Sequence, residues 1–240
     1  MRRSLLGLIV LAGAIAALPA VADDKKEGGW VQLFNGKDLT GWKLHPKPGG
    51  QIIEVLPKEK DGKLIAYYGK LKDGKEVPLW RVEGGILIGS GPASHLFSER
   101  GDYQNFHYRI EAKINDKGNS GQYFRTEFGP GFPKGYEAQI NATHTDPVRT
   151  GSLYPAGGLG KYKDKITVLN TAPHKPDEWF TQEVIANGDH IIILVNGKKT
   201  VDFKDPENRY TKGHFALQGH DPGTVVQFKK IEVKELPPSK

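Results

Sequence analysis

The chain has 240 residues, 37% of them hydrophobic, with no cysteine and a formal net charge of +6. Its lysines are scattered over apparent loops and form no basic stripe interleaved with aromatic residues, so nucleic acid is not an expected partner. Without cysteine the chain can form no disulfide and carry no lipoprotein anchor, and its stability must come from burial and backbone pairing.

The first residues have the order of a secretory signal peptide. Two arginines precede an apolar run over 5–18, and small residues follow at 20–22. The apolar run is too short to span a bilayer comfortably, and charged residues follow it at once. We therefore expect residues 1–22 to be cleaved, with no membrane anchor, and the protein to be periplasmic or extracellular. Residues 23–240 then form a single domain with its core at about 29–236.

The pattern after the signal peptide is that of strands. No long segment has apolar residues at helical spacing, whereas 30 glycines and 16 prolines separate short alternating segments. Strands are expected over 106–113 and 136–140, followed by a three-strand meander over 179–203 and a last strand over 224–233. The fold class is therefore all-β, a sandwich or barrel.

Within the meander, Asn187-Gly188 and Asn196-Gly197 favour tight hairpin turns. The continuous apolar run 191–195 between them indicates a strand buried on both faces. Two segments are less regular. Residues 56–78 are expected to form a long hairpin or insertion, and residues 141–165 a loop of the length that is often functional.

Strand alternation predicts which polar side chains share a face. If the apolar residues of 136–140 enter the core, Glu137 and Gln139 lie on the opposite face, and Gln218 and His220 likewise share a face. If the strands are neighbours in one sheet, its open face carries a cluster of hydrogen-bonding groups: Arg125, Glu137, Gln139, Gln218, His220 and Glu111. Such groups suit sugar hydroxyls, which both donate and accept hydrogen bonds. A polar face kept only for solubility is the alternative.

Several signatures of other hydrolases are missing from the chain. There is no Gly-x-Ser-x-Gly nucleophile elbow and no His-Glu-x-x-His zinc helix. His144 and Asp146, two residues apart in a loop, suggest a metal site only weakly, and a solvated loop is the favoured interpretation. No metal ligands are predicted.

Six fragments in order resemble the 3-keto-disaccharide hydrolase domain family, over essentially all of residues 29–236. The fragments span residues 30–42, 80–87, 118–121, 135–140, 150–154 and 217–220. The resemblance implies a concanavalin-like, laminin-G-like jelly roll of two antiparallel sheets with the ligand on the concave one. It also implies exported proteins that cleave glycosides already oxidised to a ketone at the third sugar carbon. The family's polar positions fall on Arg125, Glu137, Gln139, Gln218 and His220.

The chain departs from the family pattern in the long segment between Trp42 and Trp80, in Phe180, where many relatives have asparagine, and over 155–176. Such loops would set substrate choice, so the sugar and the linkage stay open, as does the oligomeric state.

A ketone at C3 acidifies the C2 proton, so a base can form an enolate and expel the glycosidic oxygen from C1. We expect Glu137 to be the base, with Glu111 in reserve, and His220 the acid. Arg125 and Gln139 would stabilise the enolate oxygen, a place that a divalent cation could take instead; no other cofactor is predicted. The substrate-binding residues are expected to be Gln139, Gln218, Glu111, Asn119, Ser120 and Tyr154. The alternatives are a non-catalytic, lectin-like carbohydrate-binding module and a structural domain of a cell-surface assembly.

Overall fold

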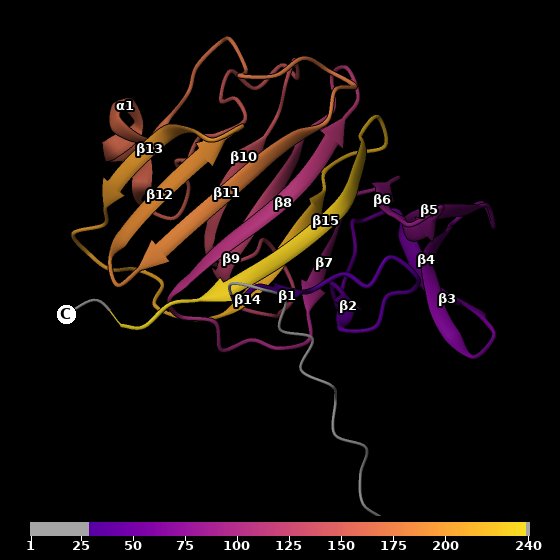
Figure 1. The fold of residues 1–240 in the computed structure, drawn as a ribbon. Coiled ribbons are helices and arrows are strands. Elements are labelled where there is room, and N and C mark those ends of the chain that lie inside the picture. The colour runs from indigo at the N-terminus through magenta and orange to yellow at the C-terminus, as the bar shows by residue number, and fades with distance from the viewer. Residues whose placement is uncertain (1–28, 239–240) are drawn as a thin grey trace, which may run out of the picture.

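The computed structural model describes residues 29–238, so the expected signal peptide over 1–22 lies outside the described residues. The described chain is almost entirely β-structure, arranged as two antiparallel sheets packed face to face (Figure 1). This is the all-β, two-sheet sandwich that the sequence predicts. No helix within 29–238 is long and apolar enough to cross a membrane.

The larger sheet has ten strands. Along its main path they are β13 (Lys198–Lys204), β12 (His190–Val195), β11 (Phe180–Asn187), β8 (Phe106–Ile114), β15 (Val225–Glu235), β6 (Ile86–Ser90), β5 (Glu76–Glu83), β4 (Lys63–Leu71) and β3 (Ile52–Lys60). The short strand β1 (Val31–Gln32) pairs with β15. Strands β3, β4 and β5 form the hairpins expected over 56–78 and extend one end of the sheet (Figure 1).

The smaller sheet has five strands. In order they are β10 (Tyr136–Ile140), β9 (Ser120–Thr126), β14 (His214–Gly219), β7 (Ser94–Ser98) and β2 (Trp42–Leu44). Between β10 and β11 the chain forms the loop 141–158, the 3-10 helix η1 (Leu159–Tyr162) and the short helix α1 (Lys163–Ile166). The irregular composition of 141–165 thus corresponds to a long connection that lies beside the edge strand β10, where Leu153 bridges to Ala138.

The core lies between the two sheets and follows from strand alternation. In β8 the residues Phe106, Tyr108, Ile110 and Ala112 are completely buried, whereas the residues between them are only partly buried. The meander also folds as predicted, and Asn196 and Gly197 both have the positive φ that a tight hairpin turn requires. The prediction that residues 191–195 form a strand buried on both faces was wrong. Strand β12 alternates between buried and half-buried residues instead of being buried on both faces, because it lies near the edge of the larger sheet.

The outer face of the smaller sheet carries a second, polar arrangement. Phe124 and Leu217 point into the core, so their neighbours Tyr123, Ala216 and Gln218 point outward. This outer face is not simply exposed to solvent, since Glu137, on the same face, has only 6% of its surface accessible. Loops cover the face and enclose its polar groups.

The packing of Trp80 generates a testable prediction. A Cβ on Gly89, its cross-strand partner, would lie 2.8 Å from the indole ring. We expect Gly89→Ala to lower the free energy of unfolding by about 1–3 kcal/mol, because the added methyl group would overlap a ring that is completely buried. Gly50→Ala is the matched control, since nothing lies within 4 Å of the place its methyl group would take and its φ is not positive. Equal urea midpoints for the two variants would contradict this account of the packing.

Candidate functional site

Glu137 in β10 is the centre of the candidate site. Its Oε2 accepts a hydrogen bond of 2.7 Å from the hydroxyl of Tyr123, which lies directly opposite on β9. The Tyr123 oxygen in turn accepts a bond of 3.2 Å from Nε2 of Gln218 on β14. Three neighbouring strands therefore contribute one hydrogen-bonded chain on the outer face. Gly121 leaves room for it, because a Cβ there would overlap Oε1 of Glu137.

Burial changes the acidity of these groups. Loss of water raises the pKa of Glu137 to about 8, with the bond from Tyr123 acting in the opposite direction and the charge of Asp146 adding to the rise. Burial, followed by the charge of Glu137, raises the pKa of Tyr123 well above its ordinary value. At neutral pH Tyr123 is therefore a hydrogen-bond donor, and Glu137 is a carboxyl group that can take up or release a proton.

The loop 141–154 brings a second acidic group beside Glu137. The Tyr154 hydroxyl donates to Oδ2 of Asp146 at 2.9 Å, and the Tyr154 backbone N–H donates to the Glu137 carbonyl at 2.8 Å. Burial, followed by the bond to Asp146, raises the pKa of Tyr154 to about 12. Tyr154 therefore joins the loop to β10 next to the central carboxyl.

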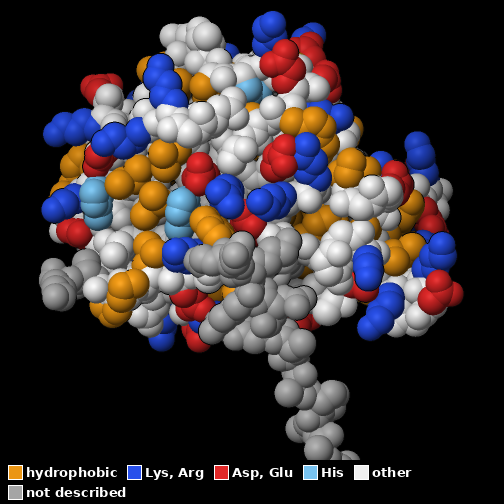
Figure 2. Space-filling model, viewed as in Figure 1, with side chains coloured by type: hydrophobic (Ala, Val, Ile, Leu, Met, Phe, Trp, Pro, Cys, Tyr) orange, Lys and Arg blue, Asp and Glu red, His pale blue; other side chains and the backbone are white. Residues whose placement is uncertain are grey.

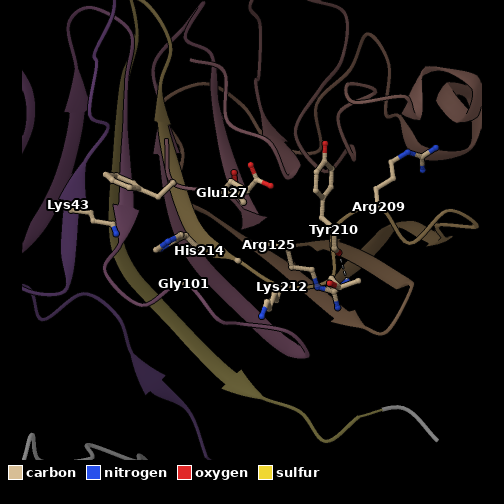
Figure 3. A pocket seen from close by; sticks show the side chains of 12 residues that line it. Lys43, Gly101, Arg125, Glu127, Arg209, Tyr210, Lys212 and His214 are labelled. Carbon is tan, nitrogen blue, oxygen red and sulfur yellow. Dashed lines mark hydrogen bonds between the residues drawn. The ribbon is translucent and has the colours of Figure 1, made fainter. Parts of the chain in front are cut away.

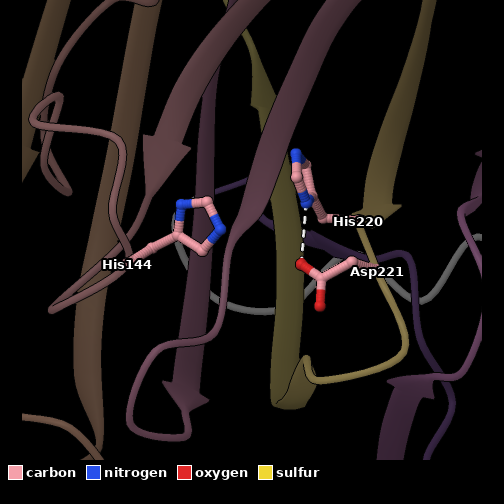
Figure 4. Close-up of side chains that lie close together, drawn as sticks. All are labelled: His144, His220 and Asp221. Carbon is pink, nitrogen blue, oxygen red and sulfur yellow. Dashed lines mark hydrogen bonds and ion pairs between the residues drawn. The ribbon is translucent and has the colours of Figure 1, made fainter.

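The end of β14 contributes an imidazole held by a carboxylate. The Nδ1–H of His220 donates to Oδ2 of Asp221 at 2.8 Å, which leaves Nε2 of His220 directed away from this pair (Figure 4). Burial alone would raise the pKa of Asp221, but hydrogen bonds from His220, Gly223 and Thr224 outweigh it and lower the pKa. Asp221 is thus ionised at neutral pH and fixes the orientation of the ring.

His144 of the loop 141–154 faces this pair, with its ring centroid 5.4 Å from that of His220 (Figure 4). His144, His220 and Asp221 each offer one ligand atom, and these atoms lie within 4.8 Å of one another. They are the residues in the described chain that could hold a divalent cation. Two histidines and a carboxylate form a donor set that suits several such ions.

Three buried polar atoms near this site have no hydrogen-bond partner among residues 29–238: Nε2 of His95, Oδ1 of Asn119 and Oε1 of Gln218. Gln218 and His95 lie directly opposite each other on β14 and β7. Burial, followed by the charges of His45 and His220, lowers the pKa of His95 to about 3, so this ring is neutral. Unpaired buried polar atoms are costly, and a bound polar ligand would satisfy them.

The structure brings together most of the sequence-predicted residues. Glu137, Gln139 and Gln218 lie on the outer face of the smaller sheet, His220 follows the end of β14, Asn119 precedes β9, and Tyr154 borders β10. Asn119 contacts the site through its Nδ2, 3.4 Å from Nδ1 of His144.

The structure places three of the predicted residues elsewhere. Glu111 lies in β8 of the larger sheet and pairs with Lys229 at 2.6 Å, so it does not share a face with Glu137. Ser120 points into the interior, where its hydroxyl donates to the Gln218 carbonyl. The expectation that Glu111 belongs to the open face was wrong, because it lies in the other sheet. Ser120 was expected to bind substrate, but its side chain points to the opposite side of β9 from Tyr123.

Arg125 departs from the prediction for a different reason. The ladder between β9 and β14 shifts register here, and Arg125 has a φ of +49°. This β-bulge turns the side chain away from the Glu137 face. The guanidinium instead donates to the backbone carbonyls of Gln104, Gly188 and Tyr210, at 2.6–3.2 Å. Arg125 therefore ties the end of the smaller sheet to neighbouring loops.

A cavity of about 720 Å³ lies at this end of the sheet, opposite to the end that carries Asn119 (Figure 3). Arg125, Lys43, Lys212 and His214 are among the residues that line it. Apart from Arg125, no predicted site residue lines this cavity. The cavity is therefore separate from the expected base and acid, Glu137 and His220.

Sequence reasoning missed Tyr123, His95 and Asp221 and assigned His144 and Asp146 to a solvated loop. Tyr123 could have been found, because it lies two residues before Arg125, which strand alternation had placed on the same face as Glu137. The other four depend on how loops or more distant strands fold back, which alternation within one strand does not reveal.

The chain is similar in sequence and in fold to known proteins. The sequence model of the 3-keto-alpha-glucoside-1,2-lyase-like domain matches residues 29–234. Two crystal structures of provisionally assigned glycosyl hydrolases from Parabacteroides distasonis are similar. One has a TM-score of 0.62 at 22% identity, covering 91% of this chain and 99% of the other. The second has a TM-score of 0.60 at 20% identity, covering 86% and 99%.

A carbohydrate-binding module from Bacillus subtilis is also similar, with a TM-score of 0.50 at 15% identity, covering 82% of this chain and 97% of the module. At these identities the likeness shows the fold alone. No curated protein matches the chain.

The raised pKa of Glu137 generates a prediction about stability. Between about pH 4.5 and pH 8 the folded state keeps a proton that the unfolded chain has released, so the free energy of unfolding falls as pH rises. Glu137→Gln cannot titrate. We therefore expect the variant to gain stability relative to the wild type between about pH 5 and pH 8, by up to about 1.4 kcal/mol per pH unit.

Urea unfolding of both proteins at the two pH values measures this difference. Glu59→Gln, which changes an exposed carboxyl, reports the effect of the substitution alone. A difference between Glu137→Gln and wild type that does not change with pH would mean that Glu137 has an ordinary pKa.

Proposed function

The chain belongs to the family of 3-keto-alpha-glucoside-1,2-lyase-like domains, and on that premise we propose that it cleaves 3-keto-glycosides by removing the C2 proton. The observation that carries the proposal is the buried carboxyl of Glu137, whose pKa of about 8 suits a base that works near neutral pH. The proposal includes export, since residues 1–22 have the pattern of a signal peptide.

The reaction begins with proton transfer from C2 to the Glu137 carboxylate. The electron pair of the C2–H bond forms the C2=C3 bond of an enolate, with negative charge on the former ketone oxygen. When the ketone re-forms, the C1=C2 bond is made and the C1–O bond breaks. Water can then add across C1=C2, with hydroxyl at C1 and a proton at C2, so that the sum of the two steps is hydrolysis.

His220 is the group that protonates the departing oxygen. Its Nδ1–H is held by Asp221, so a protonated ring offers Nε2–H to the substrate. Tyr123 and Gln218 keep the Glu137 carboxyl in place through the hydrogen-bonded chain across three strands. The buried polar atoms of His95, Asn119 and Gln218 that lack a partner would gain one from sugar hydroxyls that reach them.

A non-catalytic carbohydrate-binding module is the second candidate. The observation that favours it is the fold shared with the module from Bacillus subtilis. A binding face needs donors and acceptors but gains nothing from a buried carboxyl of raised pKa, so the enzyme is the better supported function.

Turnover of a 3-keto-glucoside, compared with that of its unoxidised parent, tests the proposal. We expect aglycone release from the keto form alone, and a loss of at least about 100-fold in kcat in Glu137→Gln and in His220→Ala. Activity of the wild type should rise with pH through about pH 8, as Glu137 ionises.

Glu111→Gln is the matched control, because this carboxyl lies on the other sheet and should leave turnover unchanged. Unchanged turnover in both Glu137→Gln and His220→Ala would show that these roles are wrong. Binding of the parent sugar without turnover of either form would favour the binding module.

A further inference from the structure

The elimination needs a positive or hydrogen-bonding partner for the enolate oxygen, and Arg125, one of the two residues expected to supply it, points elsewhere. The guanidinium of Arg125 is bound by three backbone carbonyls at the opposite end of β9. A second donor for that oxygen, beside the Gln139 amide on the Glu137 face, would then come from another part of the site. The loop 141–154 contacts Glu137 through the backbone N–H of Tyr154, whose hydroxyl in turn holds Asp146.

This loop is held rigidly where it carries His144. The completely buried Asn141 accepts a bond from the His144 backbone N–H and donates to the carbonyls of Asp146 and Val148. Arg149 donates to the carbonyls of His144 and Asp146 at 2.7 and 2.6 Å. The position of the His144 ring is thus set by the backbone around it and not by solvent.

The hydrogen bonds of His144 determine which ring nitrogen carries the proton. Its Nδ1 lies 3.1 Å from the backbone N of Asp146 and 3.4 Å from Nδ2 of Asn119. Both partners are N–H donors, so Nδ1 must accept and cannot carry a proton itself. In the neutral ring the proton is therefore on Nε2.

His220 has the opposite arrangement. Its Nδ1 faces a carboxylate, which only accepts, so the proton of the neutral ring is on Nδ1 and Nε2 has a lone pair. Figure 4 shows the ring nitrogen of His144 that lies farther from its Cβ directed towards His220 and Asp221. The two imidazoles thus differ in tautomer: His144 offers an N–H towards His220 and Asp221, whereas Nε2 of His220 points away from Asp221 and has a lone pair that can take up a proton.

We propose that His144 is a second catalytic imidazole, which donates its Nε2–H to the ketone oxygen at C3 as that oxygen becomes an enolate. The proposal rests on the proposed function and assigns its electrophile. No proton is transferred from His144; the hydrogen bond shortens as charge develops on the oxygen, which makes it stronger in the transition state than in the ground state. C2 lies between C1 and C3, so Glu137, His220 and His144 would act on three adjacent carbons.

A neutral imidazole suits this role better than a charged one. A group that donates from Nε2 while Nδ1 is held by N–H donors stays available as a hydrogen-bond donor throughout the reaction. It would not protonate the enolate oxygen, and the electron pair would remain available to expel the leaving group at C1.

Nitrogen-15 NMR of the full chain labelled in histidine tests the tautomer without any substrate. We expect the His144 signals to show a bare Nδ1 and a protonated Nε2, and His220 the reverse, near neutral pH. Loss of signals in His144→Ala and His220→Ala assigns the two rings. A protonated Nδ1 on His144 would overturn the proposal even if the enzyme turns over its substrate.

Kinetics with a 3-keto-glucoside test the role. We expect His144→Ala to lower kcat about 100- to 1,000-fold with little change in KM, as for the loss of one oxyanion donor. His144→Gln, whose amide can still donate, should recover part of the loss. His190→Ala is the matched control, because this histidine pairs with Asp202 on the larger sheet, and it should leave kcat unchanged.

Equal kcat in His144→Ala and wild type would overturn the proposal while leaving the proposed function standing. Absence of turnover in the wild type would instead remove the proposed function. A third outcome separates the donor from a metal centre. If adding Zn²⁺ or Mn²⁺ greatly raises wild-type turnover and Zn²⁺ removes the Nε2 proton of His144, the ring is a metal ligand and the proposal is wrong.

Discussion

The burial of Glu137 is the constraint to which the rest of the site is fitted. A carboxyl group that loses water on a sheet face is costly unless it is protonated or hydrogen-bonded. Tyr123 supplies a bond to one oxygen, Gly121 leaves space for the other, and Gln218 orients the tyrosine. The same burial that costs stability raises the pKa to about 8, so the ionised Glu137 carboxylate is a stronger base than an exposed one. The burial of Glu137 therefore accounts both for its hydrogen-bonded surroundings and for its raised pKa.

Much of the fold could be predicted from the sequence because alternation and turn residues are local signals. The strands over 106–113 and 136–140, the meander with its Asn-Gly turns and the last strand all form. The same alternation correctly put Glu137, Gln139 and Gln218 on one face. The prediction failed at Arg125, because a bulge interrupts the pleat there. It also failed at Glu111, because alternation shows which side of a strand a residue lies on but not to which sheet the strand belongs.

The remaining part of the site depends on contacts between distant segments. His144 lies against Asn119 and His220 only because Asn141 and Arg149 fold the loop back on itself. Asp221 acts on His220 from the next position in the chain, but a turn and not a strand sets this contact. Periodicity within a strand does not reveal such contacts, so composition assigned this loop to solvent although it lies beside Glu137 and His220.

The central claim is that cleavage proceeds through loss of the C2 proton, and turnover in D₂O tests it most directly. Hydration of the C1=C2 bond takes its C2 hydrogen from solvent, so we expect one deuterium at C2 of the released 3-keto sugar. Incubation of the released 3-keto sugar with Glu137→Gln in D₂O measures the hydrogen exchange at C2 that occurs without catalysis. Retention of the original hydrogen at C2 during full turnover would contradict the account, because direct displacement at C1 never breaks that bond.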